Sequence, residues 1–177
     1  MPLIDAATSH LLMIDFQDRL MPAIDGAQDI IANARRLSRA VQLLDIAQST
    51  TEQCPDKLGA TVAALTPPAG DALAKASFNA LGAPRIAARL AGDQTLVVCG
   101  CETHVCVLQT VLGLRALGRT VHVVADATGS RRADNRAAGL ARMAQAGAEI
   151  VTTEMVLFEW LGRADHPAFR SILAMIR

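Results

Sequence analysis

The chain has 177 residues, of which 51% are hydrophobic, enough for one domain of ordinary size with a substantial core. Its 17 basic and 17 acidic residues cancel, so no net field favours nucleic acid or an anionic membrane surface. We find neither a secretory signal nor a run of about 18 apolar residues that could cross a membrane. These features predict a soluble, cytoplasmic, single-domain protein over residues 1–177, with no nucleic-acid or membrane partner.

The first half of the chain alternates between strand and helix patterns. Residues 10–15 form an apolar run that ends in a charge, as in a buried parallel strand whose end opens on a crevice. Residues 27–44 carry apolar side chains at helical spacing. A second strand is predicted over 45–51 from a weak apolar signal, and residues 73–78 resemble the end of a third.

The second half is more regular. The predicted elements are a helix over 84–91, a strand over 95–99, a helix over 104–117, a strand over 120–125, a helix over 133–146, a strand over 148–152 and one or two C-terminal helices. This alternation predicts a three-layer α/β/α fold with a six-stranded, mostly parallel sheet of Rossmann-like topology. Ligands of such sheets bind beyond the carboxyl ends of the strands. Because no Gly-x-Gly-x-x-Gly follows the first strand, no dinucleotide cofactor is predicted.

The segment 96–110 carries the strongest functional signal, because an apolar strand breaks there at Gly100 and a helix begins. Cys106 falls in the first turn of that predicted helix. Unpaired backbone N–H groups and the positive end of the helix dipole stabilise a thiolate, which is the form of cysteine that attacks a carbonyl carbon. Cys106 is therefore the candidate nucleophile. The alternative is a small buried hydrophobic residue, the role of most cysteines.

Two charged residues lie at the other strand ends. Lys75 is one of only two lysines among the 17 basic residues, and its apolar setting favours a compact ammonium that donates to two acceptors. The alternative is a stem packed on apolar surface with its head in water. Asp15 closes the first apolar strand, where its alternative role is to cap a turn or a helix.

Asp15, Lys75 and Cys106 together supply the parts of a nucleophilic site. A thiol with a pKa of about 8.5 is only about 3% ionised at pH 7, and a nearby carboxylate lowers that fraction unless a cation offsets it. We expect Asp15 and Cys106 to share one proton, with Lys75 stabilising whichever member is charged. This arrangement gives a nucleophile, a general base and an electrostatic anchor without histidine or metal.

Other side chains near these positions have less specific interpretations. Cys99, Cys101, His104 and Cys106 crowd into eight residues, which can hardly close a tetrahedral zinc site. Cys99 and Cys101 are expected to pack, with resolution of an oxidised Cys106 as the alternative. The aromatic residues next to the proposed triad could line a small apolar pocket or pack in the core; they are Phe16 and Phe78.

These residues resemble those of a known family. Asp15 in Leu12–Gln17, Lys75 in Ala74–Phe78 and Cys106 in Gly100–Val107 resemble the Asp-Lys-Cys triad of the isochorismatase-like cysteine hydrolases. The likeness covers nearly the whole chain. The segments that most resemble the short isochorismatase domain-containing proteins are Thr51–Gln53 with Leu58–Gly59, Val123–Ala127, and the tail from Ala141–Met143 to His166–Pro167.

The resemblance implies a mechanism and further site residues. Asp15 would take the proton of Cys106, the thiolate would attack an amide-type carbonyl, and water would release the resulting thioester. Lys75 would orient the charges. The backbone N–H groups of Glu102 and Cys106 would form the oxyanion hole, next to a cis peptide between Cys101 and Glu102. Gln53 is a substrate-binding candidate on this likeness alone.

The sequence departs from the nicotinamidase branch, which carries an Asp-x-His metal site soon after its second strand. Residues 48–57 contain no histidine, so neither nicotinamidase activity nor a metal is predicted. The prediction is a metal-free cysteine hydrolase that acts on a small C–N or amide-type substrate and forms a homo-oligomer. Two alternatives remain: a vinyl-ether hydrolase like isochorismatase, with Asp15 as general acid, and a non-catalytic protein that binds small molecules or senses redox state.

Overall fold

A computed structural model of the chain describes residues 3–65 and 72–176. Within these ranges six strands form one sheet in the order β3-β2-β1-β4-β5-β6, and every pairing between them is parallel. The strands are β1 (Ser9–Ile14), β2 (Ala47–Gln53), β3 (Ala72–Lys75), β4 (Thr95–Cys101), β5 (Val121–Gly129) and β6 (Glu149–Val151). The predicted three-layer fold with a six-stranded sheet is confirmed.

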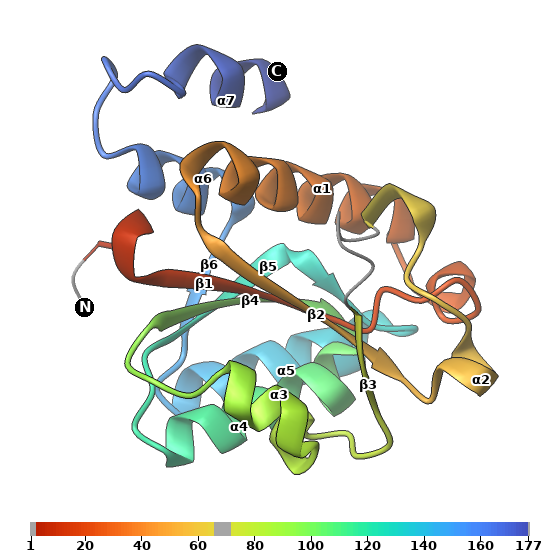
Figure 1. Cartoon of the computed structure of the whole chain (residues 1–177). Coiled ribbons are helices and arrows are strands. Elements are labelled where there is room, and N and C mark those ends of the chain that lie inside the picture. Colours follow the sequence, from red (N-terminus) through yellow and green to blue (C-terminus); the bar gives the residue numbers. More distant parts are fainter. Residues whose placement is uncertain (1–2, 66–71, 177) are drawn as a thin grey trace.

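Helices cover both faces of the sheet (Figure 1). One face carries α1 (Ala27–Leu44), α6 (Thr153–Leu161) and α7 (Phe169–Ile176), and the other carries α3 (Pro84–Arg89), α4 (Leu108–Ala116) and α5 (Ala133–Gln145). The short α2 (Pro55–Leu58) directly follows β2. Central strand β1 is buried along its whole length because alternate side chains enter the two cores. Among the helices of the described ranges, none is long and apolar enough to span a membrane.

The elements agree with the sequence pattern best where apolar periodicity is strong. Helix α1 has the predicted bounds, Ala27–Leu44. Strand β2 lies two residues later than predicted, and β4 and β5 extend two and four residues further. The predicted helix over 104–117 is divided into a π-helical turn, Thr103–Val107, followed by α4. These extensions all occur at the carboxyl edge of the sheet.

The strand order reverses between β1 and β4, because β2 and β3 follow β1 on one side while β4 pairs on the other. A crevice beyond the carboxyl ends forms at such a reversal. Gly100, near the end of β4, has a φ of +146°, and a Cβ there would lie 2.3 Å from the carbonyl oxygen of Ile14. Only glycine allows β1 and β4 to approach so closely at this point.

Candidate active site

Asp15 and Lys75 form a buried ion pair at the carboxyl edge of the sheet. Asp15 directly follows β1 and Lys75 ends β3, so the pair reaches across β2. Lys75 Nζ lies 2.7 Å from Asp15 Oδ2, and both side chains are fully buried. The hydroxyl of Thr51 on β2 donates to Asp15 Oδ1 at 2.7 Å. A buried carboxylate needs such partners, since desolvation alone would disfavour its charge.

The backbone turns sharply at Asp15. Its φ is +56°, a left-handed conformation that aspartate tolerates better than most residues. The Asp15 N–H donates to the carbonyl of Thr51 at 3.1 Å, and the carbonyl of Asp15 accepts from the N–H of Gln17 at 3.0 Å. The turn therefore holds the carboxyl group at the strand end next to β2.

Cys106 lies in the π-helical turn that follows β4. In this turn the N–H of Val107 donates to the carbonyl of Glu102, five residues back. The Cys106 side chain is buried, and its Sγ lies 3.9 Å from Gln53 Oε1. Burial and the negative charge of Asp15 raise the pKa of the Cys106 thiol to about 12, against the opposing charge of Lys75. The raised pKa places the proton on sulfur at rest, which agrees with the expectation that Asp15 and Cys106 share one proton and outweighs the stabilisation of a thiolate by a helix N-terminus.

The side chain of Gln53 contacts two of the three predicted triad residues, Lys75 and Cys106. Its Oε1 accepts from Lys75 Nζ at 2.7 Å and faces the Cys106 sulfur, while its Nε2 donates to the carbonyl of Ala76 at 2.7 Å. Sequence reasoning missed Thr51 and Gln17, which hold Asp15 and Gln53 from β2 and from the turn after β1. The sequence could have pointed to both residues, because Thr51 is near the carboxyl end of β2 and Gln17 lies two residues beyond Asp15.

Glu102 begins the turn that carries Cys106. The peptide bond between Cys101 and Glu102 is cis, as the family resemblance implies. The buried Glu102 carboxylate accepts from Arg131 Nε at 2.6 Å, which ties this turn to the end of β5. Within the described residues the Glu102 N–H donates no hydrogen bond, so it is free to face a ligand oxygen.

The two aromatic candidates differ in exposure. Phe16 is fully buried and belongs to the core beneath α1, which agrees with the packing alternative. Phe78 is 52% exposed, three residues beyond Lys75. Of these two rings, Phe78 is therefore the one that a molecule arriving from solvent could reach.

The other three cysteines lie on β4 and directly after β2. Cys99 and Cys101 are fully buried, and burial raises the pKa of both thiols well above its ordinary value. Cys54 is half-buried beside Gln53, with its Sγ 3.4 Å from Gln53 Nε2. His104 lies 3.0 Å from the hydroxyl of Ser130 through its Nδ1. Over residues 3–65 and 72–176, no group of three or more His, Cys, Asp or Glu side chains is placed to hold a metal ion.

A sequence model of the isochorismatase domain matches residues 9–155 of this chain. The chain belongs to the isochorismatase family. Members of this family are generally hydrolases. Isochorismatase domain-containing protein 1 of Danio rerio is 37% identical over 174 residues, which cover 97% of this chain and 62% of that protein. Isochorismatase domain-containing protein 2A of Mus musculus is 35% identical over 173 residues, covering 96% of this chain and 83% of the mouse protein.

Solved structures of similar proteins support the isochorismatase-family fold. The MAR1 ribonuclease from Caenorhabditis elegans superposes with a TM-score of 0.91 at 35% identity, covering 99% of this chain and 92% of that one. The YcaC gene product from Escherichia coli, described as an octameric hydrolase of unknown specificity, has a TM-score of 0.87 at 24% identity and covers 99% of this chain and 88% of its own. At that identity the likeness shows the fold alone.

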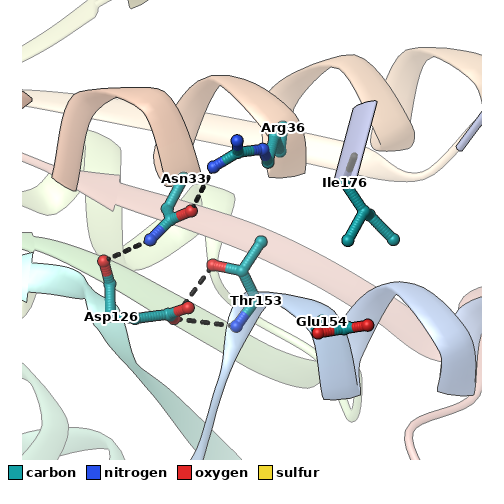
Figure 2. Close-up of a pocket in the computed structure, with 6 residues that line it drawn as sticks. All are labelled: Asn33, Arg36, Asp126, Thr153, Glu154 and Ile176. Atoms are coloured by element: carbon teal, nitrogen blue, oxygen red, sulfur yellow. Dashed lines mark hydrogen bonds between the residues drawn. The ribbon is translucent and has the colours of Figure 1, made fainter. Parts of the chain in front are cut away.

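A hollow of this isochorismatase-family protein, away from the triad residues, lies between α1, β5, α6 and α7, with a volume of about 170 Å³. Figure 2 shows Asp126 between Asn33 and Thr153 on its wall. Asp126 Oδ1 accepts from the N–H and the hydroxyl of Thr153 at 2.8 and 2.9 Å, and its carbonyl accepts from Asn33 Nδ2 at 2.8 Å. Arg36 donates to Asn33 and to the carbonyl of Met175. These bonds join the elements around the hollow to one another.

Proposed function

We propose that this protein is a cysteine hydrolase that cleaves a small C–N or amide-type substrate through a thioester on Cys106. The observation that carries the proposal is the fully buried Lys75–Asp15 pair at 2.7 Å next to the Cys106 sulfur. Burying two charges costs free energy, and charged groups in such unfavourable surroundings are concentrated at functional sites. The family to which the chain belongs, generally hydrolases, gives independent support.

The reaction starts from the neutral thiol. Asp15 accepts the proton from Cys106 as sulfur attacks the carbonyl carbon, so a C–S bond forms and the carbonyl oxygen becomes an oxyanion. The N–H groups of Glu102 and Cys106 receive that oxyanion. Its collapse breaks the C–N bond, and the amine leaves with the proton held by Asp15. Water then attacks the thioester, Asp15 takes its proton, and the acid product leaves as the thiol is restored.

Lys75 stabilises the charges in this scheme, and no step requires a metal or another cofactor. Its ammonium faces Asp15 in the resting state and opposes the rise in the pKa of the Cys106 thiol. As the proton moves to Asp15, the negative charge moves to sulfur, and the same ammonium offsets it there. Phe78 is proposed as an apolar wall of the substrate site, on the basis of its exposure.

The test is direct capture of the acyl-enzyme. The protein is mixed with a panel of small primary amides and ureido compounds, quenched in acid, and measured by intact-mass spectrometry. We expect an acyl adduct on the Cys106 peptide, and conversion of that adduct to a hydroxamate by hydroxylamine. Cys106→Ser should form no thioester. Hydrolysis of a panel member at an undiminished rate by Cys106→Ser would overturn the proposal.

A second candidate is ether hydrolysis with Asp15 as general acid, which the raised pKa of the Cys106 thiol favours because sulfur then need not ionise. Turnover of a vinyl ether that is lost in Asp15→Asn and retained in Cys106→Ser would identify this reaction. A single-stranded RNA belongs in the same panel, because the C. elegans relative is called a ribonuclease. We expect no RNA cleavage, since the 17 basic and 17 acidic residues leave no net attraction for phosphates.

We also propose that the protein forms a homo-oligomer. The E. coli structure is described as octameric, and it shares the fold of this chain. Sedimentation velocity over a range of concentrations tests the proposal. A monomer at every concentration would contradict it.

A further inference from the structure

Gln53 has a side-chain amide whose orientation is fixed by its partners. Its Nε2 lies 2.7 Å from the carbonyl of Ala76, which can only accept, and its Oε1 lies 2.7 Å from Lys75 Nζ, which can only donate. A flipped amide would place two donors together and two acceptors together. The oxygen therefore faces the ammonium of Lys75 and the thiol of Cys106, at 3.9 Å from the sulfur.

The backbone of Gln53 is held equally firmly. The N–H of Gln53 donates to Gln17 Oε1 at 2.8 Å, and the carbonyl of Gln53 accepts from Gln17 Nε2 at 3.1 Å. Gln17 is fully buried, and its Nε2 also donates to the carbonyl of Gly59 at 2.7 Å. The strand register places Gln53 directly opposite Lys75. Both the backbone and the amide are thus occupied by contacts within the protein.

We propose that Gln53 is a positioning residue of this site, whose side-chain oxygen holds the Lys75 ammonium against Asp15 and accepts the S–H of the resting Cys106. This inference rests on the proposed function for its role in turnover, and it assigns the amide to the triad rather than to a substrate. One atom, Gln53 Oε1, contacts both the ammonium of Lys75 and the sulfur of Cys106.

An acceptor in this place favours the protonated form of the sulfur. A thiol donates its hydrogen to Oε1, whereas a thiolate has none to donate and faces the negative end of the amide dipole. Oε1 also occupies a hydrogen of Lys75 that could otherwise turn to the thiolate. Besides Lys75, the titratable groups that interact with the sulfur are Asp15 after β1 and Cys101 at the end of β4. Glu102 and His104 belong to the turn that carries Cys106, and Cys54 contacts the Nε2 of Gln53.

The experiment compares two substitutions that act in opposite directions. Gln53→Leu removes the acceptor, which should lower the pKa of the Cys106 thiol. Gln53→Glu keeps the shape of the side chain but places a negative charge against sulfur, which should raise that pKa. The probe is iodoacetamide, and its rate of reaction with Cys106 is measured between pH 7 and 9 by peptide-level mass spectrometry, so that Cys54 is counted separately.

Below the pKa the alkylation rate follows the thiolate fraction, so a shift of one unit changes it about tenfold. We expect Cys106 to react about tenfold faster in Gln53→Leu and about tenfold slower in Gln53→Glu. The matched control is Gln48→Leu, because Gln48 is also on β2 and its amide accepts from Ser38 at 2.9 Å, away from the triad. That variant should leave the rate unchanged.

A merely structural role would lower the melting temperature of both Gln53 variants without separating their alkylation rates. Equal rates in wild type, Gln53→Leu and Gln53→Glu, with the fold retained by circular dichroism, would overturn the proposal. Should one variant fail to fold, the direction of the other decides. Alkylation of Cys106 can be measured without any turnover. Opposite changes in the alkylation rate of the two variants, in a protein that hydrolyses no member of the panel, would support the positioning role of Gln53 and reject only the proposed reaction.

Discussion

The triad site and the hollow in Figure 2 are both polar, but they differ in burial and in the arrangement of their hydrogen bonds. In the hollow, Asp126 accepts from the first turn of α6 and from α1, so its bonds connect helices to the sheet. In the site, Asp15 and Lys75 are fully buried and the adjacent sulfur is kept from ionising. Polar lining alone therefore does not mark a candidate active site, whereas a buried ion pair beside a thiol does.

The largest contrast is expected from removing one carboxylate in each region. If the proposed hydrolysis holds, Asp15→Asn should lower turnover of the captured amide substrate by about 10² to 10⁴, because it removes the proposed general base. The same change removes a negative charge from beside sulfur, so iodoacetamide should react with Cys106 faster than in wild type. Asp126→Asn should alter neither rate. Slower alkylation in Asp15→Asn would show that the carboxylate does not face the thiol.

The stability of the ion pair gives the next test. Lys75→Met leaves Asp15 buried without its cation, and we expect the free energy of unfolding to fall by about 3–5 kcal/mol in urea titrations. Lys57→Met, which changes the exposed lysine of α2, should be nearly neutral. A loss below about 1 kcal/mol in Lys75→Met, the range of exposed pairs, would mean that the pair is solvated.

Alkaline pH should destabilise the protein through the site sulfur. Its pKa is raised from an ordinary 9.0 to about 12 on folding, so between these values the unfolded chain has lost a proton that the folded protein keeps. The contribution of the Cys106 thiol to the free energy of unfolding is fully present below pH 9. Between pH 9 and the folded-state pKa it falls by about 1.4 kcal/mol per pH unit. Cys106→Ala should flatten the loss measured by urea titration between pH 9 and 11, and Cys54→Ala is the control. Parallel curves for wild type and Cys106→Ala would contradict the raised pKa.

The smallest effect is expected in the hollow. Asp126→Ala removes the acceptor for the N–H and hydroxyl of Thr153 at the start of α6, and the loss of hydrogen bonds of this kind costs about 1 kcal/mol. The melting temperature should fall by a few degrees. Alkylation of Cys106 should stay at the wild-type rate, and a change in that rate would show that the two regions are coupled.

Much of the fold could be predicted because apolar periodicity reports burial directly. Helix α1 follows its pattern to the residue, and Asp15, Lys75 and Cys106 were each placed at strand ends. Strand β2 was misplaced because its buried residues are polar and its partners lie far away in the sequence, as His10 does from Ser49. The π-helical turn around Cys106 could not be predicted from apolar periodicity. The suppression of thiol ionisation by Asp15 was expected from the charges, but the larger contribution of burial depends on packing between elements far apart in the sequence.

Strand β3 lies at the edge of the sheet, is four residues long, and delivers Lys75 from its last position. Edge segments open more readily than central ones, and here an opening would withdraw the ammonium from Asp15. The fraying of a single peripheral strand would thereby remove the cation from the proposed site, although β3 contributes only one side chain to it.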